Sequence, residues 1–430
     1  MPKSVDLAHP ELLSASAARA AIASGQLTSE RLVRACLERI DAREGEVKAW
    51  VNLDRNAALA RAKALDRSSD TGPLHGIPIA FKDIIDTATL PTTYGSPIYA
   101  EHRPVADAAC VSLTRRAGAV MMGKTVTTEF AVRHPNKTRN PHNLAHTPGG
   151  SSSGSAAAVG DHMVPLAFGT QTAGSIIRPA AYCGTVGYKP TIGQFSYVGV
   201  KLLSRSLDTL GAMARSVDDL VLLRSALMAT PAHLPERTRA PRIGFYRTPW
   251  WDRVEPSSQA LLNDVAAQLG KAGADVVEVD IGPALAPLSE ANVAIMAYEG
   301  CRSLAFELEF QAEKISQVLR DIMLPAQQML YGEYAQALNV AASAREAVQA
   351  TLLDFDVLLV PSAPGEAPLG LTNTGNPLFN KAWTTVGNPC ITLPAGRGPA
   401  GLPLGIQLVG NLYADEALLA SARWVETHLQ

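Results

Sequence analysis

The chain has no long apolar run and almost no excess of either charge. Its 430 residues are 47% hydrophobic, yet no stretch approaches the roughly 20 apolar residues that a membrane-spanning helix needs. Residues 1–6 include an acid and no apolar segment, so they do not resemble a signal peptide. A formal net charge of -2 creates no field that would attract nucleic acid or an anionic membrane. We therefore expect a cytoplasmic protein whose partner is a small molecule, with no nucleic acid and no membrane.

Cysteine is scarce, and its five positions are widely separated, odd in number and without a Cys-x-x-Cys pair. This pattern argues against both a disulfide framework and a zinc ribbon. We expect the cysteines to be reduced and mostly buried. They are Cys36, Cys110, Cys183, Cys301 and Cys390.

Histidine, the usual base of serine hydrolases, occurs in no convincing motif. His142 and His146 have the spacing of metal ligands on a helix, but prolines flank them and no third ligand is evident. The segment 150–154 matches the Gly-x-Ser-x-Gly nucleophile elbow, centred on Ser152, but it lacks the buried strand that must precede that elbow. The glycines of this segment fit neither of the two glycine patterns of nucleotide-binding loops. We therefore predict no metal ion and no cofactor.

The alternation of strand-like and helix-like patterns predicts an α/β fold in one large domain. Helical spacing dominates 14–64 and 287–350, and buried strands are expected at 76–85, 163–168, 357–360 and 404–409. The segment 241–280 is typical of a βαβ unit. The expected domain, 1–430, has an N-terminal helical part (1–70), a motif-rich core (72–230), the βαβ-like unit (240–285), a helical substrate-side segment (287–350) and a C-terminal return to the sheet (351–430).

Ser175 and Lys82 are candidate catalytic residues because of the sequence around each. Ser175 ends a run of small residues, in which the backbone N–H groups of Thr172, Ala173, Gly174 and Ser175 can form an oxyanion hole. Lys82 ends an apolar stretch, and burial there would lower its pKa and make it a base. Considered singly, each has a commoner structural role, as a turn serine and as a solvent-facing lysine at a strand end.

Three motifs in order, completed by a fourth segment, resemble those of the amidase signature family, from about Gly76 to Thr191. By that resemblance, Ser175 is the nucleophile, Ser151 is a bridging serine on a cis peptide, and Lys82 is the base. Ser151 and Ser175 are 24 positions apart, as expected for the two serines of this family. The resemblance also implies an acyl-enzyme mechanism and a mixed central β-sheet flanked by helices. The motifs are Gly76-Ile-Pro-Ile-Ala-Phe-Lys82-Asp83, Gly149-Gly-Ser151-Ser-Ser-Gly-Ser155-Ala, Gly169-Thr-Gln-Thr-Ala-Gly-Ser175-Ile and Cys183-Gly-Thr-Val-Gly-Tyr-Lys-Pro-Thr191.

The sequence departs from the common family pattern beside the nucleophile. Many members carry arginine two residues after the serine, whereas here Arg178 is three residues after it, and Gln171 replaces a common aspartate. This variant resembles malonamidase, in which the later arginine binds a substrate carboxylate. The resemblance implies that Arg178 anchors a carboxylate through its guanidinium, with Gln171 and Ser152 as further substrate-binding candidates. A structural ion pair is the alternative role for Arg178.

The resulting prediction is an amidohydrolase that cleaves the C–N bond of a small, carboxylate-bearing amide through a Ser-cisSer-Lys triad. The alternative is the catalytic A-type subunit of a tRNA-dependent amidotransferase, which shares the motifs and depends on partner subunits. A degenerate binding protein is disfavoured because all three triad residues are intact. Relatives also make a homodimer plausible. We expect the segments 126–147, 287–350 and 366–386 to shape the substrate pocket.

Overall fold

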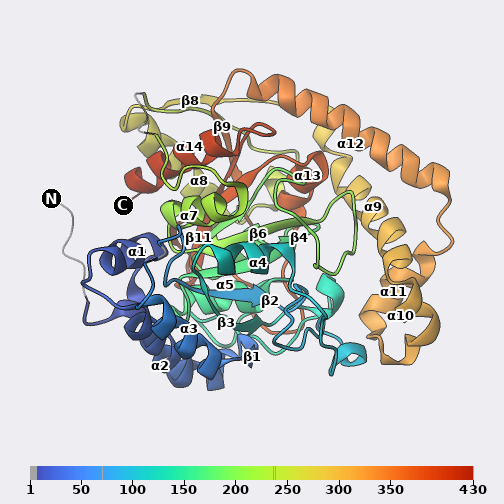
Figure 1. Cartoon of the computed structure of the whole chain (residues 1–430). Coiled ribbons are helices and arrows are strands. Elements are labelled where there is room, and N and C mark those ends of the chain that lie inside the picture. Colours follow the sequence, from blue (N-terminus) through green and yellow to red (C-terminus); the bar gives the residue numbers. More distant parts are fainter. Residues whose placement is uncertain (1–6, 70, 236, 238, 430) are drawn as a thin grey trace.

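The structure is a computed structural model of the chain and describes residues 7–69, 71–235, 237 and 239–429 (Figure 1). Within these ranges, eleven strands form one sheet. They are β1 (Trp50–Leu53), β2 (Pro78–Lys82), β3 (Val120–Thr125), β4 (Leu166–Gln171), β5 (Val186–Lys189), β6 (Thr209–Ala214), β7 (Arg242–Phe245), β8 (Asp275–Glu278), β9 (Val357–Pro361), β10 (Cys390–Arg397) and β11 (Pro403–Val409).

The α-helices lie around this sheet, with α1 to α3 at one corner and α9 to α12 along the opposite side (Figure 1). They are α1 (Ala15–Ala23), α2 (Ser29–Val47), α3 (Arg55–Leu65), α4 (Ala109–Arg116), α5 (Ser153–Gly160), α6 (Ile177–Tyr182), α7 (Val217–Met228), α8 (Pro256–Lys271), α9 (Leu288–Ser303), α10 (Ala305–Phe310), α11 (Gln317–Ala326), α12 (Tyr331–Leu352), α13 (Leu378–Val386) and α14 (Asp415–His428).

The strand order is β1-β3-β2-β4-β6-β5-β10-β11-β9-β7-β8, and the sheet is mixed. Strand β2 pairs in parallel with β3 and β4, while β10 is antiparallel to both β5 and β11. Strands β7 and β8 are parallel and are connected by α8, so they form the expected βαβ unit. The predicted α/β fold with a mixed central sheet in a single domain is confirmed.

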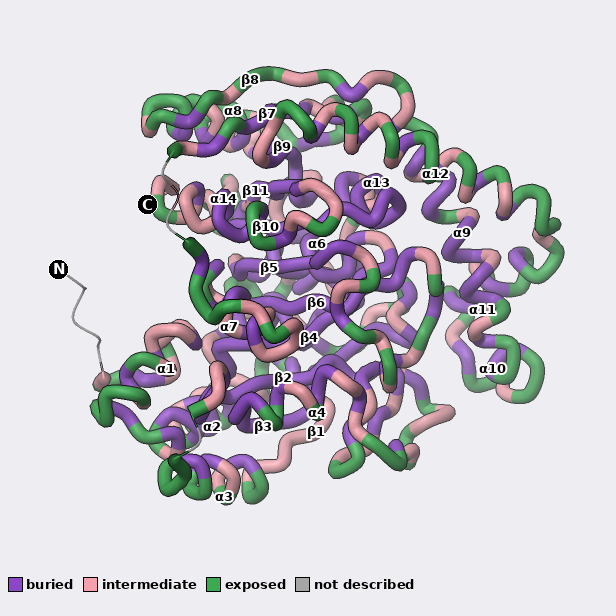
Figure 2. Tube along the Cα trace, turned by 45° about the horizontal axis from the view of Figure 1, so that its top comes forward, coloured by how far each residue is buried: buried purple, intermediate pink, exposed green. Residues whose placement is uncertain are grey.

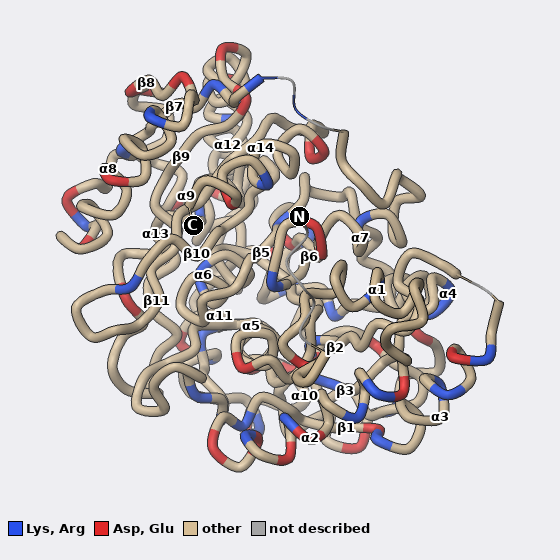
Figure 3. The backbone as a smooth tube through the Cα atoms, turned by 90° about the vertical axis from the view of Figure 1, so that its left-hand side faces the viewer, with Lys and Arg blue, Asp and Glu red and all other residues tan. Residues whose placement is uncertain are grey.

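The core lies along the middle of the sheet. Every residue of β2, β4 and β6 is buried, and Figure 2 shows burial concentrated on the central strands and exposure on the outer helices. On the outside, basic and acidic segments alternate along α2 and α3 (Figure 3). All five cysteines are buried free thiols. None of the helices in the described ranges is long and apolar enough to cross a bilayer.

Helix α5 packs closely against the sheet, as its run of small residues predicts. Residues 153–159 are all buried, and a Cβ atom on Gly154 would lie 2.3 Å from the Ala49 carbonyl oxygen. Only glycine fits at such a distance. The loop that precedes α5 is thereby held against β3 and β4, where the bridging serine was predicted.

Strand β4 is longer at its C-terminal end than the sequence suggested. The apolar run 163–168 predicted a strand that ends at Gly169, whereas β4 continues to Gln171 because Thr170 and Gln171 pair with Leu210 and Thr209 of β6. That prediction of the strand end was wrong, since pairing with a distant strand offsets the polar character of these residues. The loop that carries Ser175 therefore begins directly at the end of a central strand.

Candidate active site

Lys82 is the last residue of β2 and has no solvent exposure. Its Nζ donates hydrogen bonds to Ser151 Oγ at 2.7 Å and to Thr170 Oγ1 at 2.9 Å. Burial lowers the pKa of Lys82 to about 7, against the opposing effect of the Asp208 charge. A neutral amine is therefore well populated near neutral pH. The structure thus buries Lys82 and excludes its alternative role as a solvent-facing lysine at a strand end.

Ser151 lies in the loop between β3 and α5, and its hydroxyl is held by Lys82. The Gly150–Ser151 peptide is cis, as the family resemblance implied. The Ser151 carbonyl accepts a hydrogen bond from the Thr128 N–H at 3.2 Å, and the Gly150 carbonyl accepts one from Arg178 Nη2 at 2.6 Å. These contacts fix the loop on both sides of the cis bond.

Ser175 lies in the turn between β4 and α6, is 8% exposed and lines a cavity together with Ser151. Gly174 packs against α13, and a Cβ atom on it would lie 2.5 Å from Asn380 Oδ1. Within the described residues, the N–H groups of Ala173, Gly174 and Ser175 donate to no protein acceptor. They are available to a substrate oxygen, which is the arrangement an oxyanion hole requires.

The Gln171 side chain fixes the turn that carries Ser175 by hydrogen bonding. Its Oε1 accepts hydrogen bonds from the N–H groups of Ile176 at 2.9 Å and Ile177 at 3.1 Å, and its Nε2 donates to Thr384 Oγ1 at 2.9 Å. The residue is 1% exposed and is not among the residues that line the cavity. Its polar atoms are thus already used within the protein, although the sequence led us to expect contact with substrate.

Ser152 also lies outside the cavity lining. It is fully buried, and its Oγ donates to the Thr170 carbonyl and accepts from the Thr170 N–H, both at 3.2 Å. The side chain ties the loop of the bridging serine to β4. This placement favours a structural role over the substrate contact that we expected.

Arg178 belongs to α6, is 4% exposed and lines the cavity. Besides the Gly150 carbonyl, its Nη2 bonds Thr374 Oγ1 at 3.1 Å, while its Nε has no partner. Burial lowers the pKa of Arg178 to about 10. Among the described residues it takes part in no ion pair, so the structural ion pair does not account for its position. The guanidinium retains donors for an anion.

The two histidines with metal-like spacing do not converge on a common point. His142 Nε2 lies 3.0 Å from the Cys183 carbonyl oxygen, and His146 Nδ1 lies 2.7 Å from the Ala367 carbonyl oxygen. Each ring is thus oriented by a different backbone group.

Asp208 is a buried residue that sequence reasoning missed. Its carboxylate accepts hydrogen bonds from Thr172 Oγ1 at 2.5 Å and from the N–H groups of Leu203 at 2.8 Å and Ser204 at 3.1 Å. Burial raises its pKa to about 6, with the Thr172 hydroxyl opposing the shift. Asp208 thus forms a hydrogen bond with the turn before Ser175 and acts on Lys82 through its charge. The sequence feature that could have identified Asp208 is an acidic residue directly before an apolar strand.

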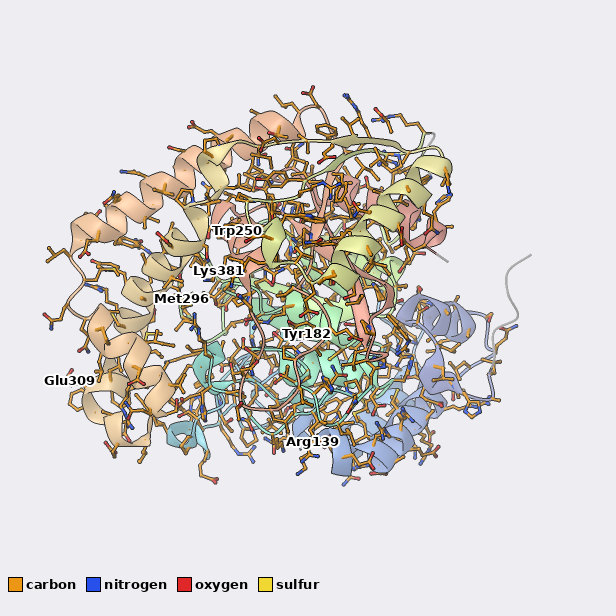
Figure 4. The ribbon with its side chains drawn as sticks, turned by 180° about the vertical axis from the view of Figure 1, so that it is seen from behind. Arg139, Tyr182, Trp250, Met296, Glu309 and Lys381 are labelled. Carbon is orange, nitrogen blue, oxygen red and sulfur yellow. The ribbon has the colours of Figure 1, made fainter. Side chains whose placement is uncertain are left out.

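A cavity of about 980 Å³ opens beside Ser175. Apart from Arg178 and residues of the motifs, its walls come from the three segments that we expected to shape the pocket. Figure 4 shows two of the wall residues, Met296 and Lys381, close together. The wall residues are Ala131, Val132, Arg133, His134 and Pro135, then Asn292, Val293, Met296 and Val318, and finally Pro368, Leu371, Thr372, Asn373, Thr374, Gly375, Asn376, Pro377 and Lys381.

The family described as Amidase matches residues 31–419, which is most of the chain. The chain belongs to the amidase signature family. Solved structures agree with this membership. An amidase crystal structure superimposes with a TM-score of 0.89 at 28% identity, covering 97% of this chain and 100% of the other. The peptide amidase of Stenotrophomonas maltophilia gives a TM-score of 0.83 at 30% identity, covering 97% and 96%.

Curated relatives within the family include components of an amidotransferase. The A-type subunit of glutamyl-tRNA(Gln) amidotransferase from Chloroflexus aggregans is 35% identical over 463 aligned positions, covering 95% of this chain and 94% of the relative. A chain from a protein complex connected with the origins of an s-triazine catabolic enzyme matches with a TM-score of 0.88 at 28% identity, covering 96% and 98%. The amidase signature resemblance is confirmed, whereas closeness to malonamidase stays a prediction.

Proposed function

We propose that this amidase hydrolyses the C–N bond of a carboxylate-bearing amide, with Ser175 as nucleophile, Ser151 as proton bridge and Lys82 as base. The observation that carries the proposal is the buried 2.7 Å contact between Lys82 Nζ and Ser151 Oγ, at the wall of the cavity that Ser175 also lines. A lysine whose pKa lies near 7 is matched to proton transfer at neutral pH.

In the first half of the reaction, neutral Lys82 takes the proton of Ser151 while Ser151 takes the proton of Ser175. Ser175 Oγ then forms a bond to the amide carbonyl carbon, and the carbonyl oxygen becomes an oxyanion. The N–H groups of the turn stabilise this charge as it develops. The turn itself is held in place by Gln171.

In the second half, the leaving nitrogen receives the proton returned from Lys82 through Ser151, and the C–N bond breaks. The product at this point is an ester between the acyl group and Ser175. A water molecule attacks the ester and gives its proton to the same relay. The acid leaves, and the hydroxyl of Ser175 is restored.

Arg178 is the group we propose to bind the substrate carboxylate. Its guanidinium lies in the cavity wall near the nucleophile, is almost wholly buried and has an unpartnered Nε. Hydrogen bonds between charged partners are stronger than neutral ones, and burial protects them from water. An anionic substrate would therefore satisfy an arginine that the protein leaves without a carboxylate.

The test is ammonia release by the purified chain alone, from paired amides with and without a carboxylate. We expect hydrolysis that is lost in Ser175→Ala, and a preference for the carboxylate-bearing amide that is lost in Arg178→Ala. Full activity of Ser175→Ala would refute the relay. If Arg178→Ala slowed both kinds of amide equally, Arg178 would not be a carboxylate anchor.

A second candidate is the amidotransferase role that the curated relatives favour. The A-type subunits of glutamyl-tRNA(Gln) amidotransferase match this chain over nearly its whole length. The charge of the cavity favours the stand-alone enzyme instead, because free glutamine carries an ammonium group and none of the described residues that line the cavity is acidic. Ammonia release by the chain without any partner protein would decide against the amidotransferase role. A homodimer and a cytoplasmic location remain predictions.

A further inference from the structure

The cavity beside Ser175 carries more positive charge than one carboxylate requires. Arg133, Arg178 and Lys381 all line it, and the described residues of its wall include no aspartate or glutamate. Burial, with the charges of Arg133 and Arg178, lowers the pKa of Lys381 to about 8. The three cations are thus near enough to repel one another. An anion bound among them would relieve that repulsion.

Lys381 belongs to the first turn of α13 and is half-buried. Its Nζ contacts Ser289 Oγ at 3.3 Å, and among the described residues it takes part in no ion pair. Its backbone is fixed, because the Lys381 carbonyl accepts a hydrogen bond from Thr385 Oγ1 at 2.8 Å. The ammonium is therefore held on a rigid helix at the cavity wall without a compensating charge.

A second unsatisfied group faces the same cavity from α9. Asn292 is fully buried and lines the cavity, and its Oδ1 has no hydrogen-bond partner. Its Nδ2 donates to the Thr172 carbonyl at 3.2 Å and to Thr385 Oγ1 at 3.1 Å. Because a carbonyl cannot donate, the amide cannot be turned around without losing the Thr172 bond. Asn292 thus leaves a buried acceptor without a partner beside the cavity.

The volume of the cavity also exceeds what the smallest monoamides need. At about 980 Å³ it lies at the upper end of the range of roughly 300–1,000 Å³ that is typical of ligand pockets. A substrate that reaches only from Ser175 to Arg178 would leave Lys381 without a partner. A larger anion would contact both cations.

We propose that Lys381, assisted by Arg133, forms a second anion subsite, so that the substrate is a monoamide with two carboxylates, one at Arg178 and one at Lys381. This inference rests on the proposed amide hydrolysis and names its substrate class. The second carboxylate adds binding energy at a position remote from the bond that is cleaved.

The test compares three amides that share a five-carbon chain: valeramide with no carboxylate, glutaramate with one, and tricarballylic acid 1-amide with two. We expect the wild type to prefer the dicarboxylate. Lys381→Met should lower kcat/KM for that substrate by about 10- to 100-fold and leave glutaramate within about 3-fold. Lys381→Arg should retain most of the preference. Lys271→Met, at the exposed end of α8, is the matched control and should change none of the rates.

Equal losses on all three amides in Lys381→Met, or a wild type that does not prefer the dicarboxylate, would overturn the subsite. Binding of tricarballylate to Ser175→Ala, measured by calorimetry, separates this failure from failure of the proposed function. Suppose that no amide is hydrolysed, that tricarballylate binds to Ser175→Ala, and that adding Lys381→Met to that variant weakens the binding. The anion subsite is then supported and the proposed amide hydrolysis is refuted. If amides are hydrolysed and tricarballylate does not bind, the reaction stands and the subsite is wrong.

Discussion

Burial of the Lys82 ammonium shifts its protonation equilibrium toward the neutral amine, and the pH dependence of hydrolysis should follow. The pKa of Lys82 is lowered to about 7, and only the neutral form can accept a proton. We expect kcat/KM to rise about tenfold per pH unit below that value and to level off above it. Rates between pH 5.5 and 9 with an amide that does not titrate in this range will measure the profile. A flat profile would show that Lys82 is not the base.

Asp208 should set the position of the acidic limb, which is the pH range in which kcat/KM rises before it levels off. Its negative charge raises the pKa of Lys82, so removing the charge in Asp208→Asn lowers the pKa further. The limb should therefore move to lower pH while the plateau persists. Asp219→Asn is the matched control, because Asp219 is also buried but caps the start of α1 by accepting the Ser16 N–H. A limb that stays in place in Asp208→Asn, or moves equally in the control, contradicts this role.

Loss of the nucleophile and loss of the base should differ in how completely they stop turnover. Ser175→Ala removes the atom that forms the acyl-enzyme, so turnover should fall to background. Lys82→Ala leaves the nucleophile but no base, and kcat should fall by about a thousandfold or more. Far-UV circular dichroism will show whether both variants remain folded. Substantial activity in either folded variant would refute the relay.

At the scale of elements, Gln171 connects β4 to the start of α6 and so fixes the nucleophile turn. Gln171→Leu leaves two buried N–H groups without an acceptor, at a cost of about 1–3 kcal/mol each. We expect a lower Tm together with a lower kcat. Gln171→Glu keeps an acceptor for both N–H groups and should lose less Tm. Both quantities can be measured by calorimetry and steady-state kinetics, and an unchanged kcat in Gln171→Leu would contradict the prediction.

Elements with a local signature were predictable, and those defined by distant pairing were not. Strands β2, β4, β7, β9 and β11 were anticipated because each includes a short run of apolar residues next to turn residues, and β8 was anticipated as the second strand of the βαβ unit. Strands β1, β3, β5, β6 and β10 were missed. Strand β5 (Val186–Lys189) has four residues and includes a glycine, so its pairing with β6 and β10 supplies what its own sequence lacks.

The site was predictable only as far as its motifs extend. Lys82, Ser151 and Ser175 were found by their order and spacing, and the structure brings Ser151 into contact with Lys82 and into one cavity wall with Ser175. Asn292 and Lys381 reach the same cavity from segments that carry no motif. Their importance comes from unsatisfied atoms and uncompensated charge, which exist only once the chain is folded.

At the scale of the whole molecule, the sheet connects the two halves of the chain through β5 and β10. Strands β1 to β6 are contiguous in the sheet, so residues 1–235 alone would leave the β5 edge unpaired and α6 without its contacts to β10 and β11. We expect residues 1–235 expressed alone to show no cooperative thermal unfolding, whereas the full chain should. Circular dichroism melts of both will test this. A cooperative transition in the fragment would mean that residues 1–235 form an independent domain.

The place of β10 in the sheet has a consequence for how the protein is made. Strand β5 ends at Lys189, yet its neighbour β10 ends at Arg397, so the edge of the nascent sheet stays unpaired while about 200 further residues are added. At roughly 5–20 residues per second this takes about 10–40 seconds on the ribosome. Exposed strand edges recruit other chains. Slow or interrupted translation of the second half should therefore favour aggregation over folding, and chaperone binding to the nascent first half should oppose it.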